Sequence, residues 1–206
     1  MNRRAMTHAF RAIAALVLPL VLTASLAACG GSPSQTAERP PLEGARIGGP
    51  FTLVDKTGKT VRWDDFKGKY RIVYFGYTFC PDACPTDMQR IAAGLARFEK
   101  AQPQRAAQVQ PIFITIDPER DTPAALKAYT NAFPGLTALT GTPAQIAAVA
   151  KEYAVFYQKI ADKSMGYKMD HSRTAMLFGP KGEPLALVAQ DKGAEQVADD
   201  IERWAR

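Results

Sequence analysis

The most regular pattern in the chain is an almost uninterrupted apolar stretch over residues 71–79, RIVYFGYTF, rich in β-branched and aromatic side chains. Such a stretch predicts a central strand that is covered on both faces. Directly after it, apolar residues recur at helical spacing from Met88 to Phe98, which predicts an amphipathic helix over residues 85 to about 100 with Pro85 in its first turn. The helix is expected to pack on that strand.

Similar patterns of strand and helix continue along the rest of the chain. Thr122 and Thr142 each precede a proline and a helical pattern, so both are predicted N-caps, the second within a capping box. The predicted elements are a hairpin over 51–55 and 59–62, a strand over 109–116, helices over about 123–132 and from 142 to 153, strands over 173–179 and 185–190, and a last helix over about 193–205. This order predicts an α/β, thioredoxin-like fold with an added N-terminal β-hairpin and an inserted helix.

The N-terminus has a different pattern. Residues 1–28 contain three arginines, no acidic residue and a 16-residue apolar run that ends at Cys29, which is typical of a secretory signal. Small residues directly before Cys29 resemble the lipobox of bacterial lipoproteins, where cleavage leaves a lipidated cysteine. We expect a lipoprotein signal peptide over 1–28, lipidation of Cys29 and a flexible tether over 29–46, followed by one domain over 47–206.

The alternative is an uncleaved anchor, although the run is shorter than the roughly 20 residues of a spanning helix. Both interpretations place the domain in the cell envelope, on the periplasmic side of a bacterial membrane. The formal charge of +6 includes the three signal arginines, and the remaining charges are interspersed in sign, so nucleic acid is not an expected partner.

Cys80 and Cys84 lie where the predicted strand meets the predicted helix. Free backbone N–H groups at a helix start favour thiolates, and the four-residue spacing lets both sulfurs face the same way. The pair could therefore close a Cys80–Cys84 disulfide or clamp a metal. A purely stabilising disulfide is the simpler interpretation, but so short a loop contributes only about 2 kcal/mol.

His171 is the one histidine left after removal of the signal, and it ends a predicted loop over residues 161–170 before the strand at 173–179. A lone histidine is commonly a surface or core residue. If that strand runs beside the cysteine-bearing strand, however, His171 faces the helix start. Two thiolates and one imidazole are a soft set suited to copper, with zinc as the second candidate.

GYTFCPDACPTDM, DPERDTP and DHS, in this order, resemble the Sco/SenC family of copper chaperones over residues 47 to about 200. The resemblance implies a thioredoxin-like domain with Cys80, Cys84 and His171 as ligands of one copper ion. It also implies copper delivery to the binuclear copper centre of cytochrome c oxidase, on subunit II, and exchange with other periplasmic copper carriers. Such a chaperone is not primarily an enzyme, but its cysteine pair could also reduce the thiols of the target site.

Three other functions stay open. A dedicated thiol-disulfide reductase would use the same cysteines, although such enzymes carry CxxC and a cis-proline, whereas no proline occurs from Met165 to Gly179. A redox or copper sensor is the second alternative. A peroxiredoxin is disfavoured, because Tyr77 occupies the position where that family has threonine.

Several neighbouring residues are candidates for supporting roles. Asp82 and Asp170 adjoin the predicted ligands and could orient the imidazole or tune the charge at copper. Met165 and Met169 could bind copper transiently or only cover apolar surface. The acidic and basic residues of DPERDTP could face a partner, although a turn with an N-cap explains most of that motif: Asp117, Glu119, Arg120, Asp121.

Overall fold

The computed structural model describes residues 38–206. Residues 39–206 form one compact unit around a seven-stranded mixed sheet of order β2-β1-β5-β4-β3-β8-β9. Its strands are β1 (Thr52–Asp55), β2 (Thr60–Arg62), β3 (Tyr70–Gly76), β4 (Val109–Thr115), β5 (Thr137–Thr140), β8 (Ala175–Phe178) and β9 (Pro184–Val188). The helices are α1 (Ala83–Ala101), α2 (Pro103–Ala106), α3 (Pro123–Thr130), α4 (Pro143–Glu152) and α5 (Ala194–Trp204), with short 3-10 turns at Trp63–Phe66 and Gln190–Lys192. The predicted thioredoxin-like fold is confirmed.

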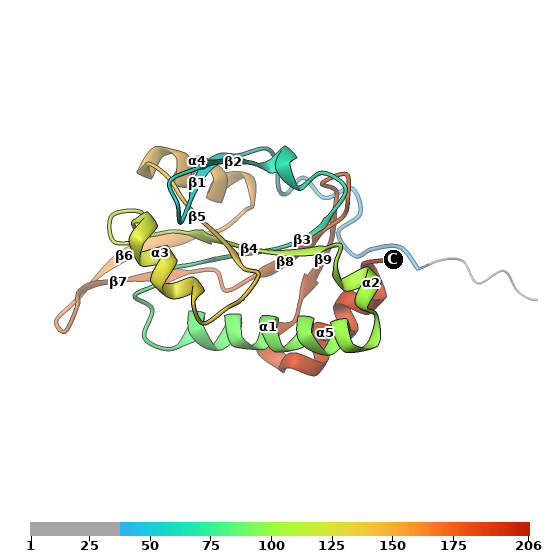
Figure 1. The fold of residues 1–206 in the computed structure, drawn as a ribbon. Coiled ribbons are helices and arrows are strands. Elements are labelled where there is room, and N and C mark those ends of the chain that lie inside the picture. Colours follow the sequence, from blue (N-terminus) through green and yellow to red (C-terminus); the bar gives the residue numbers. More distant parts are fainter. Residues whose placement is uncertain (1–37) are drawn as a thin grey trace, which may run out of the picture. The chain divides into compact units, whose positions relative to one another are not determined.

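The predicted central strand is β3. It pairs in parallel with β4 and antiparallel with β8, and its residues from Arg71 to Gly76 are buried. Figure 1 shows α1 and α5 together along one side of the sheet and α4 on the other. Because helices cover both faces, the strand can be apolar at every position, as its sequence is.

The N-terminal hairpin is also confirmed, and helices form at both places predicted between residues 123 and 153. β1 and β2 pair antiparallel and join the sheet through β5, a strand that the sequence pattern did not predict. Thr122 accepts a hydrogen bond from the Ala125 N–H, and Thr142 forms the capping box with Gln145. Short polar side chains therefore begin α3 and α4 where the sequence placed these helix starts.

The predicted loop over residues 161–170 is instead a β-hairpin, formed by β6 (Tyr157–Asp162) and β7 (Gly166–His171) as a separate two-stranded sheet. Asp162 accepts hydrogen bonds from the Ser164 and Met165 N–H groups, and Gly166 has a φ of 79°, so polar turn chemistry closes the hairpin. His171 is thus the last residue of a strand rather than the end of a loop.

Part of the predicted tether belongs to the compact unit. Within the predicted tether, the Leu42 N–H donates to the Leu185 carbonyl; just after its predicted end, the Gly48 N–H donates to the Glu152 carbonyl. A Cβ at Gly48 would lie 2.4 Å from the Phe178 ring, so only glycine allows this close passage. The unit therefore begins nearer residue 39 than residue 47. The predicted signal peptide and Cys29 lie outside the described residues, and no helix from residue 38 onward is long and apolar enough to cross a membrane.

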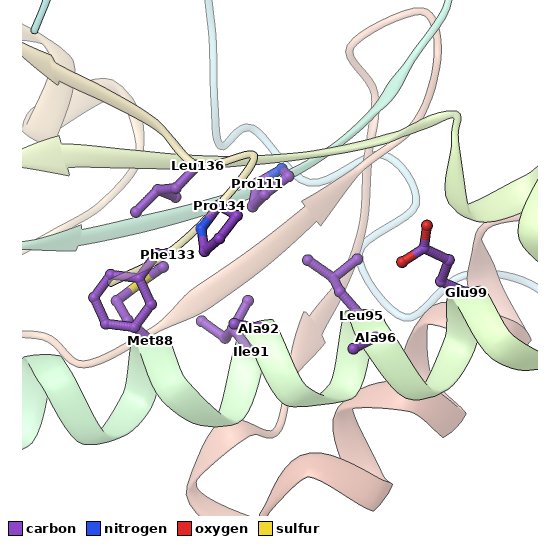
Figure 2. Close-up of a pocket in the computed structure, with 10 residues that line it drawn as sticks. All are labelled: Met88, Ile91, Ala92, Leu95, Ala96, Glu99, Pro111, Phe133, Pro134 and Leu136. Atoms are coloured by element: carbon purple, nitrogen blue, oxygen red, sulfur yellow. The ribbon is translucent and has the colours of Figure 1, made fainter. Parts of the chain in front are cut away.

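An apolar groove of about 300 Å³ runs between α1 and the connection from α3 to β5. Figure 2 shows Met88, Ile91 and Leu95 of α1 facing Pro134 and Leu136 across it. Its lining includes none of the predicted metal ligands.

Candidate metal centre

The fold brings Cys84 and His171 together although they are 87 positions apart in the chain. Cys84 is the second residue of α1, and its Sγ lies 3.4 Å from Nε2 of His171 at the end of β7. A Cβ at Gly76 would lie 3.2 Å from the Cys84 sulfur, so this glycine at the end of β3 leaves room for the side chain. Cys84 is fully buried, whereas Cys80 is partly exposed in the loop between β3 and α1.

Cys80 and Cys84 are not joined by a disulfide, and their pKa values are shifted in opposite directions. The hydrogen bond from the Cys84 thiol lowers the pKa of Cys80 to about 3 against the effect of burial, and contacts with His171 and with the N–H groups of Cys84 and Asp82 act in the same direction. Donating that hydrogen bond to Cys80 raises the pKa of Cys84, and burial of the Cys84 thiol raises it further. The sequence predicted acidic thiols at the helix start; the structure divides the pair into an accessible thiolate and a buried thiol.

The His171 imidazole is oriented by the backbone. Its Nδ1 lies 2.9 Å from the Ser172 carbonyl oxygen, which can only accept, so Nδ1 carries a proton. The Tyr74 and Tyr77 rings pack edge-on against the imidazole with centroids at 6.4 and 6.0 Å. Nε2 is therefore the nitrogen available to a ligand, and it is the one that faces Cys84.

The two aspartates adjoining the predicted ligands do not orient the imidazole. Asp170 is exposed on the outer side of β7, and the Ser172 carbonyl takes the role that its carboxylate was expected to fill. Asp82 is the exposed N-cap of α1, where its backbone N–H, rather than its carboxylate, stabilises the Cys80 thiolate. From residue 38 to the C-terminus, no group of three or more His, Cys, Asp or Glu side chains is arranged as it stands to hold a metal ion.

A family model described as SCO1/SenC matches residues 39–206. The chain belongs to the SCO1/SenC family. The SenC protein of Rhodobacter capsulatus is 40% identical over 158 residues, covering 76% of this chain and 70% of the relative. The mitochondrial SCO1 homolog 1 of Arabidopsis thaliana is 35% identical over 170 residues, covering 82% of this chain. This chain spans half the length of that plant relative.

Among solved structures, the copper-bound ScoI of Bradyrhizobium japonicum resembles this SCO1/SenC protein with a TM-score of 0.69 at 41% identity. The match covers 77% of this chain and 99% of that one. Copper, the ion that the sequence predicted, is bound in this related structure, and the three ligands stay a prediction.

Sequence reasoning missed an ion pair beneath the site of this SCO1/SenC protein. Asp87, one helical turn after Cys84, is fully buried and accepts hydrogen bonds from the Tyr74 hydroxyl at 2.9 Å and from the Arg173 guanidinium at 2.8 and 3.0 Å. A carboxylate on the apolar face of α1 was the signal that could have found it. The pair ties the segment after His171 to the helix that carries Cys84.

The DPERDTP segment also supports the cysteine loop. The Asp121 carboxylate, buried behind the loop, accepts hydrogen bonds from the Thr78 N–H, the Thr78 hydroxyl and the Thr115 hydroxyl at 2.9, 2.6 and 2.6 Å. Burial raises the pKa of Asp121. Asp121, which the sequence offered as part of a turn or of a partner-facing surface, thus points inward and holds the backbone two residues before Cys80.

Proposed function

We propose that this SCO1/SenC protein carries one copper ion as cargo, held by Sγ of Cys80, Sγ of Cys84 and Nε2 of His171, and delivers it to the copper site of cytochrome c oxidase subunit II. The observation that carries the proposal is the 3.4 Å contact between Cys84 Sγ and His171 Nε2 beside the Cys80 thiolate. The copper bound to the related ScoI of B. japonicum supports the choice of ion.

The chemistry of these three residues favours Cu(I). Two sulfur ligands and one imidazole are soft donors, and Cu(I) accepts low coordination numbers, whereas structural zinc takes four ligands. Copper binds the form in which both cysteines are thiolates, so copper uptake must displace the proton that the Cys84 thiol donates to Cys80. Oxidation of the pair to a disulfide removes both sulfur ligands and empties the site.

Delivery proceeds by ligand exchange at the exposed side of the site. Cys80 is partly exposed and already ionised, whereas Cys84 is buried, so an incoming partner thiolate reaches copper on the Cys80 side. Each thiolate of the partner then replaces one ligand of the donor site. Other periplasmic copper carriers that present thiolates could exchange copper by the same route.

The place of this chemistry follows from the proposed processing of the N-terminus. A lipid on Cys29 tethers the domain to the periplasmic side of a bacterial membrane, where the oxidase copper site is assembled. Metabolic labelling with a radioactive fatty acid tests this directly, because the label should enter the wild-type protein and not Cys29→Ser. Incorporation into both would exclude Cys29 as the lipidated residue.

A second function is favoured by the acidity of Cys80. A thiolate at neutral pH can attack a partner disulfide; the Cys80 sulfur forms a mixed disulfide as one partner sulfur leaves as thiolate, and Cys84 then loses its proton, attacks Cys80 and releases the second. The partner is reduced and the Cys80–Cys84 pair oxidised. This reductase would prepare the target thiols, and it does not require His171.

Anaerobic titration with Cu(I) against a chelator distinguishes the two functions. The full-length chain should carry Cys29→Ser so that only Cys80 and Cys84 supply thiols. A copper chaperone binds one copper per chain, and both Cys84→Ser and His171→Ala weaken that binding. If His171→Ala leaves copper affinity unchanged while turnover of a partner disulfide persists, the protein is a thiol reductase.

A further inference from the structure

Arg120 lies in the turn between β4 and α3, and its guanidinium contacts two segments remote in sequence. Nε is paired with the carboxylate of Asp117, and Nη1 donates to the backbone carbonyl of Tyr167 on β7 at 3.0 Å. The guanidinium carbon lies 3.7 Å from the Tyr167 ring centroid and 5.0 Å from that of Phe79. One side chain therefore joins the turn, the β6–β7 hairpin and the cysteine loop.

Tyr167 is held at both its ring and its hydroxyl. The hydroxyl donates to Asp117 at 2.9 Å, and this carboxylate is 1% exposed, so its bonds with Arg120 and Tyr167 lie in a poorly solvated environment where charged hydrogen bonds are strong. Arg120 itself is mostly buried, and its Nη2 has no hydrogen-bond partner. The guanidinium therefore holds Asp117 and Tyr167 in fixed positions relative to each other, although its Nη2 nitrogen donates to no partner.

The held tyrosine lies on the same side of β7 as the predicted ligand. Side chains alternate along a strand, so Tyr167, Met169 and His171 face the domain, and the exposure pattern of β7 follows this alternation. Met169 is buried on this side, which makes it a packing residue rather than an accessible copper ligand. Holding Tyr167 thus fixes the inner face of the strand whose last residue is His171.

We propose that Arg120 is a positioning residue for the copper site: by holding Tyr167 against Asp117 it sets the position of His171 relative to Cys84. The inference rests on the proposed function, since it assigns Arg120 a role in copper binding. A second ion pair joins the same turn to the same hairpin, between Glu119 and Lys159 at 2.6 Å, but its side chains are 59% and 42% exposed. Lys159 Nζ also lies 4.2 Å from the Tyr167 ring centroid, so Lys159→Met removes an exposed ion pair and a ring contact but leaves the bonds among Arg120, Asp117 and Tyr167 in place. Exposed contacts of this kind contribute little, which makes Lys159→Met a matched control for charge and ring contact.

The test compares Arg120→Met with Lys159→Met, because each removes one positive charge from the same neighbourhood. In the Cys29→Ser full-length chain, Arg120→Met should weaken Cu(I) binding about 10-fold, the lower range for partners that orient a ligating histidine. Lys159→Met should stay within about twofold of the parent. Without metal, the histidine ring NMR signal that His171→Ala removes should shift in Arg120→Met and not in Lys159→Met.

A double-mutant cycle separates positioning from general stabilisation. If Arg120 acts through His171, adding Arg120→Met to His171→Ala should cause no further loss of copper affinity. Equal weakening in both backgrounds, or none in either, overturns the positioning role. If Arg120→Met does not fold, Tyr167→Phe replaces it, with a smaller loss of about threefold that should also vanish without His171.

The parent protein reports separately on the proposed function. If it binds no Cu(I), or if His171→Ala binds as tightly as the parent, copper carriage by these three residues fails. If the parent and His171→Ala behave as expected while Arg120→Met matches Lys159→Met, only the role of Arg120 fails.

Discussion

Arg173 binds the buried carboxylate of Asp87 through both Nε and Nη2, at 3.0 and 2.8 Å. Arg173 follows His171 by two residues and Asp87 follows Cys84 by three, so this ion pair links the two segments that carry these proposed ligands.

Arg173→Met should destabilise the protein, because it leaves the Asp87 carboxylate with the Tyr74 hydroxyl as its remaining partner among these contacts. The Arg173 side chain is 46% exposed, and water can replace part of its interaction, so we expect a loss of about 1–3 kcal/mol rather than the full cost of an unpaired buried charge. Urea unfolding measures it. The control is Arg90→Met on α1, the helix that carries Asp87, since the Arg90 side chain donates one long, exposed hydrogen bond to the Asp191 carbonyl. Equal losses of unfolding free energy in both variants would show that Asp87 does not depend on Arg173.

Cys80 should remain reactive in mild acid. Its pKa is lowered to about 3, so the thiolate stays the main form down to that value and is lost only as the pH falls through it. An unperturbed thiol, with a pKa near about 8.5, is almost entirely protonated at pH 6. The rate of alkylation by iodoacetamide, measured from pH 2 to 9, reports the midpoint.

Cys84→Ala provides the control for this acidity, because it removes the sulfur that donates to Cys80 and should move the alkylation midpoint upward. An unchanged midpoint would mean that the hydrogen bond from Cys84 is not its main cause.

Copper uptake should release unequal numbers of protons from the two cysteine variants. In the parent, the proton displaced from sulfur comes from Cys84, whose pKa is raised, while Cys80 is already ionised. In Cys84→Ser the serine hydroxyl can still donate to the Cys80 thiolate, so this variant should release about one proton fewer per copper than the parent, and Cys80→Ser about the same number. Calorimetry in buffers of different ionisation enthalpy measures the difference. Equal reductions in both variants would contradict the thiolate–thiol assignment.

Gly76→Ala should displace the Cys84 sulfur and weaken copper binding. The added Cβ would lie 2.9 Å from the Tyr74 and Phe113 rings and 3.2 Å from that sulfur, which is overpacking with a typical cost of about 1–3 kcal/mol. Thermal unfolding and Cu(I) titration test both effects. Gly49→Ala is the control, because its Cβ meets nothing closer than 3.7 Å; wild-type copper affinity in Gly76→Ala would show that the site tolerates the shift.

Local patterns predicted most of the elements. The apolar stretch at residues 71–79 and the capped helix starts at Thr122 and Thr142 carry short-range signals, and the structure confirms them. β5 was missed because Thr137–Thr140 is only four residues long and lies between two helices. The β6–β7 hairpin was missed because its many polar and charged residues lack a clear apolar alternation, and its inner face is covered by the domain only after folding.

The sequence by itself determined the fold class and the candidate ligands, since cysteine spacing, a single histidine after the signal and strand–helix order are all properties of the chain. Only the tertiary structure decided how these residues act. The thiolate–thiol division of Cys80 and Cys84, the orientation of His171 by Ser172 and the contacts of Arg120 with Tyr167 depend on distances of a few ångströms between segments far apart in sequence. Hydrogen bonds and burial act over such distances, and no local pattern encodes them.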